Sequence, residues 1–463
     1  MVVIDGLRSG VRKFRKRETL SIARLLSASN LIVPLLALVS GLIAFAPFVG
    51  REGTDWYGLG IGGASLVYFS WSMLLASRVE SVQRLFGGFD RTYIWHRMFS
   101  LLAVLTMWLH IQAENDVGNP IMPFGEDMAE LGYELAELAE QIVIVLTIVS
   151  IFKIVPYAIW KFSHKLFIVP FLLGAFHFIT SENTFALFSA WSNYFLVFVA
   201  LGTIAFVYRI IAIDLGLSLR AFKVSELDDY DQYLEITVVP ARNKKVRLPE
   251  AGQFVFISFP EFSKEQHPFS ISEFEANGEL TIRVAKTGDW TKNKLSKLRI
   301  GSRAMVSKPS GELRLDNPSA NNRVWFAAGS GVAPYLSAVE MIKDAKPTSL
   351  VYSYRETFKP MALEQLRALA IESDNFELVE VNTAKRSRLE ALEIAELVDA
   401  GSHVVACGPE ELIDSVRVNS SDAESFDFEM YDYRLSYDPK PLFRKGFKKV
   451  REIVGRSQLV SRS

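Results

Sequence analysis

Cysteine is almost absent from this chain of 463 residues, since Cys407 is the only one. An intrachain disulfide is therefore excluded, and a zinc or iron–sulfur site built on several cysteines is disfavoured. A strong overall charge is also lacking, because the formal net charge is -1, so no global field attracts nucleic acid. The basic N-terminus is followed by an apolar run of spanning length without a small-residue cleavage pattern, so no cleavable signal peptide is predicted.

Apolar residues are in excess, and they gather in the first half of the chain. Hydrophobic residues make up 49% of the sequence and the mean hydropathy is +0.18. A helix needs about 20 mostly apolar residues to cross a bilayer. We therefore expect a basic arm (1–28) and then an all-α bundle of six transmembrane helices within residues 29–214. The six candidate spans are 29–49, 57–77, 93–113, 141–160, 165–181 and 192–214.

Basic residues alternate between the loops of this bundle. The N-terminal arm, the loop after the second span and the loop before the fifth are basic, whereas residues 114–140 contain many acids and no Lys or Arg. Basic loops stay in the cytoplasm, so both termini are predicted there, in a multi-pass protein of a bacterial inner or plasma membrane. Residues 126–140 fit either an amphipathic helix on the outer surface or a solvated acidic loop.

Four of the six histidines lie in or at the ends of the predicted spans: His96, His110, His164 and His177. An ionisable side chain at membrane depth is costly and suggests function, although a lone one is often a packing residue. His96 and His110 are 14 residues apart, which places them on one helix face about 21 Å apart along the axis. His164 and His177 are 13 apart, a rise of about 20 Å on a helix that runs the same way.

These spacings predict one histidine pair at the inner level (His96 and His164) and one at the outer level (His110 and His177). Two facing imidazoles at each of two depths suit two six-coordinate haems, so the four histidines are our candidate iron ligands. An ideal helix leaves His177 about 140° around from His164. Either local rewinding near Pro170 corrects this offset, or His164 lies in a non-helical approach to the span.

Basic residues flank the inner pair: Arg91, Arg97, Lys161 and Lys165. They fit partners for haem propionates, and they also fit simple positive-inside anchors. A protein of a different class, a transporter or channel whose histidines relay protons under nucleotide control, predicts no haem at all.

The pattern changes near Ala221 to short alternating runs such as YLEITVV and GQFVFISF, which predict an antiparallel β-barrel over residues 215–318. After Asn322 the strand VWFAA leads into Gly329-Ser330-Gly331, and further strand–helix units follow. This alternation predicts an α/β domain with a parallel sheet over residues 319–434. A Gly-x-Gly turn between strand and helix lets phosphate approach backbone N–H groups, although a tight packing turn looks the same.

In this order, the paired histidines and the motifs HPFSIS, GDWT, GSGVAP and ACGP resemble the ferric reductase and NADPH oxidase superfamily over about residues 25–434. The resemblance implies a multidomain membrane protein: a six-helix domain with two haem b groups, an FAD-binding barrel and an NAD(P)-binding domain. NADPH or NADH would reduce FAD in the cytoplasm, and electrons would pass through the haems to an acceptor on the outer face. Oxygen is the acceptor that we expect, with a ferric or cupric chelate or an outer-face partner protein as alternatives.

The resemblance also assigns residues. FAD would lie against His267, Pro268, Phe269, Ser270, Ile271, Ser272, Gly288, Trp290, Thr291 and Tyr431. The NAD(P) nucleotide would contact Gly329, Gly331, Pro334, Ser353, Arg355, Cys407, Gly408 and Pro409. Arg355 fits a partner for a 2′-phosphate, which favours NADPH, but the neighbouring Glu356 favours NADH.

The sequence departs from the family pattern at Ala333, where Thr is usual, and at KPSG (308–311), where a Gly-Pro-aromatic-Gly run is usual. Both departures concern the fit of the nucleotides. A basic tail over residues 435–463 fits a segment that lies on anionic lipid, or a solvated tail.

Overall fold

The computed structural model describes residues 31–430, apart from 152–154, 231, 243–245, 287, 343 and 356–359. The chain forms two compact units, of which the first ends at Arg209 and the second begins at Ile210. The positions expected for the N-terminal arm, Tyr431 and the basic tail lie outside the described residues.

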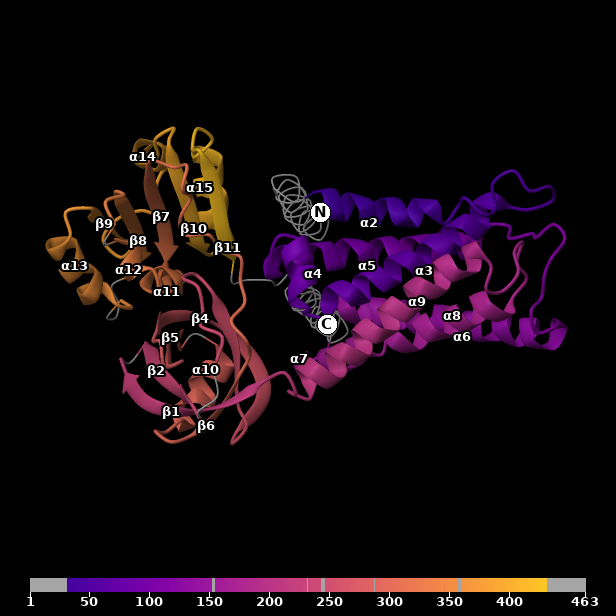
Figure 1. The fold of residues 1–463 in the computed structure, drawn as a ribbon, viewed down its shortest axis with the longest axis horizontal. Coiled ribbons are helices and arrows are strands. Elements are labelled where there is room, and N and C mark those ends of the chain that lie inside the picture. The colour runs from indigo at the N-terminus through magenta and orange to yellow at the C-terminus, as the bar shows by residue number, and fades with distance from the viewer. Residues whose placement is uncertain are drawn as a thin grey trace, which may run out of the picture. The chain divides into compact units, whose positions relative to one another are not determined.

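The first unit is all-helical (Figure 1). α3 packs against α2, α8 and α9, and α6 packs against α8. The π-helix η1 (Arg209–Asp214) continues from α9 and crosses the boundary between the two units in the chain. The helices are α2 (Ile32–Ile43), α3 (Trp56–Ala76), α4 (Glu80–Leu85), α5 (Phe89–Gln112), α6 (Glu126–Ile151), α7 (Tyr157–Lys165), α8 (Ile168–Thr180) and α9 (Ala190–Tyr208).

Four helical stretches in the described part of the chain are long and apolar enough to cross a membrane: Trp56–Ala76, Phe89–Gln112, Ile159–Thr180 and Ala190–Asp214. They correspond to the second, third, fifth and sixth predicted spans. The first predicted span forms the shorter apolar helix α2 of 12 residues, followed by turns. The full six-helix count is therefore not confirmed.

The fourth predicted span differs most from expectation. Residues 126–140 form neither a separate surface helix nor a loop, because they are the first half of α6, which runs unbroken from Glu126 to Ile151. Its 26 residues extend about 39 Å, more than a bilayer core is thick. The acids sit in its exposed first half, and Ala129, Gly132 and Ala139 form part of its buried face. These small residues continue the buried face of the apolar segment toward the N-terminus, so α6 remains one helix beyond that segment.

The break between α7 and α8 rotates the fifth span. Pro170 has no N–H and its ring crowds the carbonyl of residue i−4, Leu166. Around that carbonyl the bonds become i to i+3: Leu166 N–H donates to Ser163 O (2.9 Å) and Val169 N–H to Leu166 O (2.9 Å). Each residue in such a turn rotates about 20° more than in an α-helix. The helix is therefore overwound at residues 166–167 by about 40° in total, which is part of the offset between His164 and His177.

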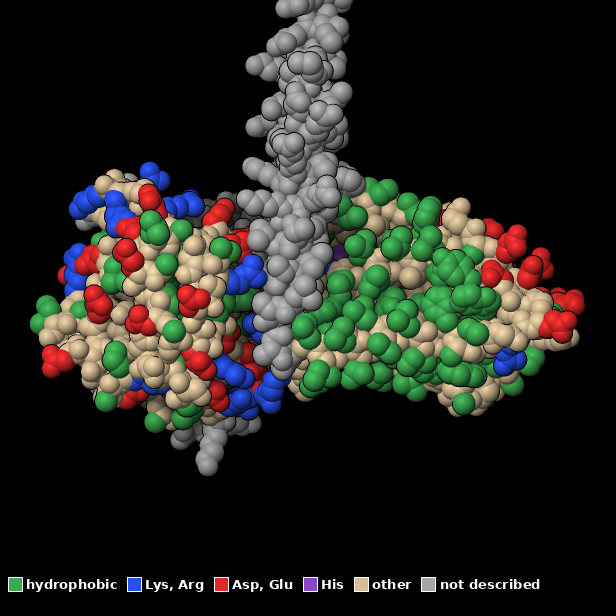
Figure 2. Space-filling model, turned by 90° about the horizontal axis from the view of Figure 1, so that it is seen from above, with side chains coloured by type: hydrophobic (Ala, Val, Ile, Leu, Met, Phe, Trp, Pro, Cys, Tyr) green, Lys and Arg blue, Asp and Glu red, His purple; other side chains and the backbone are tan. Residues whose placement is uncertain are grey.

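The surface of the helical unit has two kinds of region. Hydrophobic side chains cover the flank that Figure 2 shows, and acidic side chains gather at one end. The exposed apolar residues come from several helices, among them Leu101, Trp108, Val145, Phe162 and Ile204. Such a broad apolar surface belongs in lipid rather than in water.

The second unit begins with a closed six-stranded barrel, in the order β1-β2-β5-β4-β3-β6. Its interior is filled by alternate residues of the strands, such as Ile236, Ile257 and Ile282. The antiparallel barrel expected from the alternating runs is confirmed. Its strands are β1 (Arg220–Asp229), β2 (Tyr233–Pro240), β3 (Phe254–Phe259), β4 (Ser263–Phe274), β5 (Leu280–Ala285) and β6 (Arg303–Val306), with α10 (Asp289–Asn293) and η2 (Leu295–Lys297) between β5 and β6.

A parallel five-stranded sheet follows, in the order β11-β10-β7-β8-β9. Trp325 of β7 packs with Tyr335 and Leu366 on one face, while Phe326 packs with Ile394 and Ile413 on the other. Both faces are thus covered by helices, as the strand–helix alternation predicts. The elements are β7 (Asn322–Ala328), η3 (Gly329–Val332), α11 (Ala333–Leu336), α12 (Val339–Ile342), β8 (Thr348–Tyr354), α13 (Leu363–Glu372), β9 (Phe376–Asn382), α14 (Ala391–Leu397), β10 (Ser402–Gly408), α15 (Glu410–Asn419) and β11 (Ser425–Met430).

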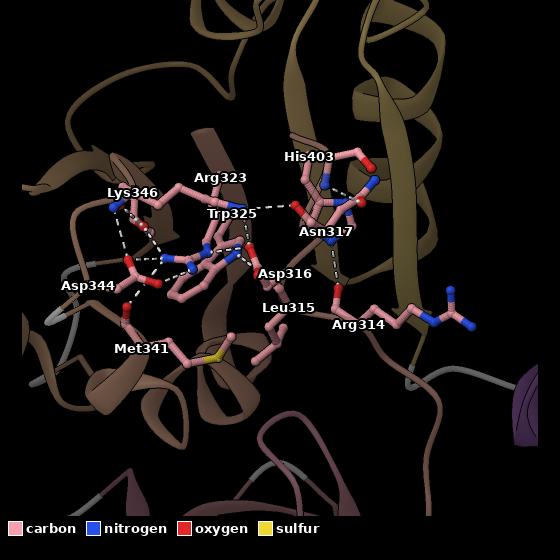
Figure 3. Close-up of polar contacts among 12 residues, drawn as sticks. Arg314, Leu315, Asp316, Asn317, Arg323, Trp325, Met341, Asp344, Lys346 and His403 are labelled. Atoms are coloured by element: carbon pink, nitrogen blue, oxygen red, sulfur yellow. Dashed lines mark hydrogen bonds and ion pairs between the residues drawn. The ribbon is translucent and has the colours of Figure 1, made fainter. Parts of the chain in front are cut away.

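The connector between barrel and sheet, residues 314–317, is bound to the N-terminal edge of the sheet (Figure 3). His403 Nε2 donates to Arg314 O (2.8 Å), and Trp325 Nε1 donates to Leu315 O (3.0 Å). Asn317 Nδ2 donates to Ser425 Oγ (2.8 Å). The connector is therefore fixed by strands β7, β10 and β11, at the edge opposite the carboxyl ends of the strands.

Arg323 is the charged centre of this attachment (Figure 3). Its side chain is 1% exposed and binds Asp316 (Nε–Oδ1, 2.8 Å) and Asp344 (Nη2–Oδ2, 2.5 Å). Lys346 also contacts Asp316 (2.9 Å). The paired cations hold the pKa of the Asp316 carboxyl below its ordinary value, although burial alone raises it. The network stays ionised because each buried charge has an opposite partner.

Replacing Arg323 with Gln should destabilise this edge by about 2–3 kcal/mol, less than a fully buried pair because Asp344 keeps contact with water. The measurement is native-state hydrogen exchange of the β7 amides, which should become faster by tens of fold. Arg367→Gln is the matched control, since its bonds to Glu364 and Glu380 are at the surface and should matter much less. Equal effects of the two substitutions would contradict the role of the buried network.

Candidate cofactor sites

The inner histidine pair meets inside the helical unit. The ring centres of His96 in α5 and His164 in α7 are 6.1 Å apart, with the rings nearly perpendicular. His96 Nδ1 donates to the carbonyl oxygen of Ser72 (2.8 Å), and His164 Nδ1 hydrogen-bonds the hydroxyl of Ser150 (3.1 Å). A carbonyl only accepts, so His96 carries its proton on Nδ1 and Nε2 bears a free lone pair.

In the outer pair, His110 has the same kind of hydrogen bond as His96. His110 Nδ1 donates to Gly58 O (2.8 Å), which again leaves Nε2 as the unprotonated nitrogen. Glycine makes room for this ring, since a Cβ at Gly62 would lie 2.8 Å from His110 Cε1. His177 in α8 faces the backbone of Gly132 through its buried Nδ1, and it interacts electrostatically with His110. Its ring centre is 5.2 Å from that of Tyr133.

These features fit haem iron between the imidazoles. A metal–nitrogen bond of about 2 Å and about 1 Å more to each ring centre separate two axial imidazoles by roughly 6 Å, and the inner pair has that spacing. Ligating histidines usually donate their second nitrogen to a carbonyl or hydroxyl, which fixes the ring. His96 and His110 do so, and His164 bonds a hydroxyl.

The predicted flavin motif lies on β4 and faces β3, with Phe254 opposite Ser270 and Ile257 opposite His267. A β-bulge between Ile271 and Glu273 interrupts its ladder with β5 and leaves Ser272 without a partner across the strand. Ser272 is fully buried, and its hydroxyl has no hydrogen bond within the described residues. An orphaned donor at a bulge is costly, so a bound polar group is expected there.

α10 brings the second flavin motif to the first. Trp290 lies over His267 with ring centres 3.9 Å apart, and it is 6.3 Å from Phe269. The buried Trp290 Nε1 also has no hydrogen-bond partner among the described residues. Gly288 and Thr291 bond each other instead: Gly288 N–H donates to Thr291 Oγ1 (3.0 Å). Two orphaned donors beside an aromatic cluster fit a flavin nucleotide.

The predicted nicotinamide residues converge between β7 and β10. The strand order reverses there, and ligands of such sheets bind at the carboxyl ends of the strands beside this switch point. A Cβ at Gly331 would lie 2.3 Å from Cys407 O, so only glycine permits this approach. Gly329 has a φ of +55° and Gly408 one of +151°, the left-handed region that favours glycine.

The remaining nucleotide candidates surround this edge. Pro334 is buried in the first turn of α11, and Pro409 is the N-cap residue of α15. The buried Tyr335 hydroxyl lies 3.1 Å from the carbonyl oxygens of both Phe326 and Val405, and so ties β7 to β10. Tyr354 is the last residue of β8 and Ser353 precedes it, and Arg355 follows with its side chain exposed.

Comparison with known proteins yields three consecutive matches. Residues 61–175 match the family described as "Ferric reductase like transmembrane component". Residues 218–321 match "FAD-binding domain", and residues 326–418 match "Oxidoreductase NAD-binding domain". The chain belongs to the ferric reductase and NADPH oxidase superfamily. Its three matched segments combine an apolar helical domain with an FAD-binding and an NAD-binding domain in one chain.

Individual relatives are distant. A probable cell surface ferric reductase of Aspergillus oryzae is 24% identical over 379 residues, which cover 71% of this chain and 48% of that protein. A probable respiratory burst oxidase homolog of Arabidopsis thaliana is 37% identical over 71 residues, 15% of this chain and 8% of that protein. The electron transfer subunit of dihydroorotate dehydrogenase B from Caldanaerobacter subterraneus is 25% identical, over 37% of this chain and 66% of that protein. The chain thus spans less than two thirds of the relatives' own lengths.

Glu429 is a site residue that the sequence reasoning left unassigned. It pairs in register with Cys407 at the end of β11, so this superfamily member has an acid beside its expected nicotinamide edge. The side chain is buried, and Oε2 has no hydrogen-bond partner among the described residues. Burial raises the pKa of Glu429 to about 8, and the acid therefore stays protonated at neutral pH. The signal for this residue in the sequence was an acid in the last predicted strand of the domain, at the position that pairs with Cys407.

Replacing Glu429 with Gln should remove a pH-dependent loss of folding stability. The native pKa is raised, so the folded chain keeps a proton that the unfolded chain loses, and stability falls as pH rises from about 4.5 to about 8. The variant lacks this loss, so its Tm should match wild type near pH 5 and exceed it at pH 8 by about 5 °C. Thermal melts of the detergent-solubilised full chain test this, and a difference that does not vary with pH would contradict it.

Proposed function

We propose that this protein carries electrons from cytoplasmic NAD(P)H through FAD and two haem b groups to molecular oxygen on the outer face of the membrane, producing superoxide. The observation that carries the proposal is the inner histidine pair, with ring centres 6.1 Å apart and the His96 proton held on Nδ1 by Ser72. Four histidines at two depths of an apolar bundle, two of them with Nδ1 bound to a backbone carbonyl, are better explained by metal ligation than by packing.

The proposed ligands are His96 and His164 for the inner haem, and His110 and His177 for the outer haem. When bound, flavin accepts a hydride and releases single electrons, and each haem iron carries one electron. The protein holds these groups and excludes water. Since the four histidines would supply the protein ligands of both irons, no further residue of the chain would need to bind the acceptor.

The soluble half would position both nucleotides. His267, Phe269 and Trp290 would pack around the flavin, with Ser270 near its reactive nitrogen and Ser272 at its phosphates. Tyr431 is proposed to stack on the ring. The glycines at 329, 331 and 408 would bring backbone N–H groups to the nicotinamide nucleotide, and the neutral Glu429 would hold a proton beside it.

Reduction of a ferric or cupric chelate is the second candidate. The similarity to the Aspergillus ferric reductase, which extends over 71% of this chain, favours it. Superoxide and ferrous-iron assays run side by side on the purified protein decide between the two acceptors. A proton-relaying channel predicts no haem, and the absence of a Soret band from the purified chain would favour that class.

The orientation proposed for the bundle follows from its charges. The acids at Glu114, Asp116 and the first half of α6 are exposed, and this segment contains no Lys or Arg. The positive-inside rule places such a segment outside and the nucleotide module in the cytoplasm.

His110→Ala should remove one of the two haems, because one imidazole cannot hold a six-coordinate iron alone. The measurement is the ratio of haem to protein together with the reduced-minus-oxidised spectrum. Trp108→Ala is the control, since Trp108 lies on the same helix with an exposed side chain and should leave both haems. A His110→Ala protein that retains two intact haems would remove His110 from the ligand set.

Arg355→Ala tests the choice of nucleotide. A charge-assisted bond to a 2′-phosphate contributes about 1.5–3 kcal/mol, so the KM for NADPH should rise about tenfold or more. The KM for NADH should stay nearly unchanged and serves as the internal control. Steady-state kinetics with both nucleotides give the answer, and equal losses would mean that Arg355 does not contact the phosphate.

A further inference from the structure

A turn on the outside of the barrel has an exposed isoleucine at its tip. Leu298 is buried in the barrel core and anchors the chain just before this turn. Ser302 N–H donates to Arg299 O (3.0 Å), which closes a four-residue turn with Ile300 and Gly301 at its tip. Gly301 has a φ of +90°, the conformation that glycine favours in such turns. Ile300 is 68% exposed, although polar residues are usual at turn tips.

The turn is bound to the neighbouring strand β1. Gly301 N–H donates to Val224 O (2.8 Å), and Val224 N–H donates to Ser302 O (3.0 Å). Two backbone hydrogen bonds and a buried anchor hold the tip in one place. Ile300 is therefore presented to the surroundings by a fixed part of the barrel.

Three cations accompany Ile300 at this turn. Arg299 precedes it directly, and the exposed side chains of Lys223 in β1 and Arg303 in β6 lie at opposite positions of the two paired strands. Like charges at opposite positions of an antiparallel pair destabilise a sheet. Among the described residues none of the three side chains has an ion-pair partner. We call Lys223, Arg299, Ile300 and Arg303 the basic loop face.

The chain around this face is also positively charged. Residues 292–308 contain six Lys or Arg and no acid. Glu261 offsets part of this charge, since its Oε1 accepts the backbone N–H of Arg303 (2.9 Å). Such a local excess of positive charge attracts an anionic surface.

The barrel is attached directly to the end of an apolar span. The stretch Ala190–Asp214 is long and apolar enough to cross a membrane. Gln266 of β4 donates through Nε2 to the carbonyl oxygen of Ile213 at the end of this stretch. Leu215 and Leu217 follow, and their side chains are exposed. Apolar side chains at this place suit the boundary between headgroups and acyl chains.

The basic loop face lies within reach of the bilayer surface. Lys223 follows Asp214 by nine residues, which span about 30 Å at most. The span thus keeps the face at a high local concentration beside the membrane, so that few contacts are needed to hold it there.

A lipid surface fits this face better than a protein does. A stable protein interface covers about 800 Å² on each side and has a core of several apolar residues. The basic loop face has one. A small apolar group together with Lys and Arg is typical of segments that bind the interface of an anionic bilayer.

We propose that the basic loop face binds the anionic phospholipid headgroups of the bilayer that holds the helical unit, with Ile300 inserted at the boundary between headgroups and acyl chains. Lys223, Arg299 and Arg303 pair with lipid phosphates, which offsets the repulsion between the two opposite cations. The barrel thereby gains a second attachment to the membrane besides the chain itself. The inference uses the apolar character of the helices and does not rest on the proposed haem ligation.

A spin label at position 300 tests this in the full chain reconstituted into vesicles. Ile300→Cys gives a selective attachment site, because Cys407 is the only native cysteine and is fully buried. In vesicles of phosphatidylcholine and phosphatidylglycerol, the label should be more accessible to oxygen, which concentrates among acyl chains, than to a water-soluble nickel chelate. In vesicles of phosphatidylcholine alone, this preference should disappear.

Ile371→Cys is the matched control for the label. Ile371 is an isoleucine of α13 in the nucleotide domain and is 85% exposed. A label there should be more accessible to the chelate than to oxygen in both kinds of vesicle.

The charges are tested with the label kept at position 300. Combining Lys223→Gln with Arg303→Gln should lower the ratio of inserted to free label about tenfold or more in the anionic vesicles. Both side chains are exposed, so the fold should be retained. Arg367→Gln combined with Arg388→Gln removes two exposed cations from the nucleotide domain and should leave the ratio unchanged.

The outcomes separate this inference from the proposed function. A label at 300 that is as accessible to the chelate as the label at 371 in anionic vesicles would overturn the docking. A label shielded from both oxygen and chelate would mean that a protein covers the face, and would also overturn it. Neither measurement uses nucleotide, flavin or haem, so a chain that binds no haem would contradict the proposed function alone.

Discussion

The hydrogen bond from a buried imidazole Nδ1 to a backbone oxygen is the interaction on which the membrane half depends. A histidine at membrane depth is costly unless both ring nitrogens are engaged. Ser72 O and Gly58 O engage Nδ1 of His96 and His110, which turns Nε2 of each ring inward. Gly62 makes room for the His110 ring, and a Cβ at Gly132 would lie 3.6 Å from His177 Cα.

The soluble half is organised around a second constraint, the meeting of two loops at the switch point of the sheet. Gly331 lies so close to Cys407 that no residue with a Cβ fits there. The Tyr335 hydroxyl lies within hydrogen-bond distance of carbonyl oxygens in both β7 and β10 and so links these two strands. At the opposite edge the connector from the barrel is fixed by Arg323, Trp325 and His403. The proposed hydride transfer would require two rings in contact, and a fixed connector between the barrel and the sheet would help to align them.

Much of this arrangement could be predicted from residue patterns. The alternation of apolar residues predicted the barrel, and the strand–helix alternation predicted the parallel sheet. The spacing of the histidines predicted the inner pair. Motif residues such as Gly331 and Ser272 were predictable because their chemistry depends on local backbone geometry. Residues 126–140 are helical, which is one of the two alternatives expected, but they belong to the same helix as the residues that follow because a buried stripe of small residues extends α6. In such a segment the apolar periodicity favours a packed helix, whereas the acidic charge favours exposure to water. Packing against α8 favoured the helix.

Other features had no local signal. The place of the α7–α8 break depends on which carbonyl Pro170 crowds. The position of Glu429 beside Cys407 depends on the pairing of β11 with β10 in the folded sheet. The network at Arg323 joins residues that are far apart in sequence, with Asp344 21 positions away. Contacts of this kind arise from topology, so a pattern along the chain does not reveal them.

Electron transfer across the bilayer is the central claim, and a sealed vesicle tests it most directly. The haem-loaded protein is reconstituted into liposomes that enclose ferric cytochrome c, and NADPH, which does not cross the bilayer, is added outside. We predict that the enclosed cytochrome c becomes reduced under these conditions, because electrons pass from the outward-facing nucleotide module to the lumen. Reduction of acceptors only on the side to which NADPH is added, with the enclosed cytochrome c unchanged, would contradict it.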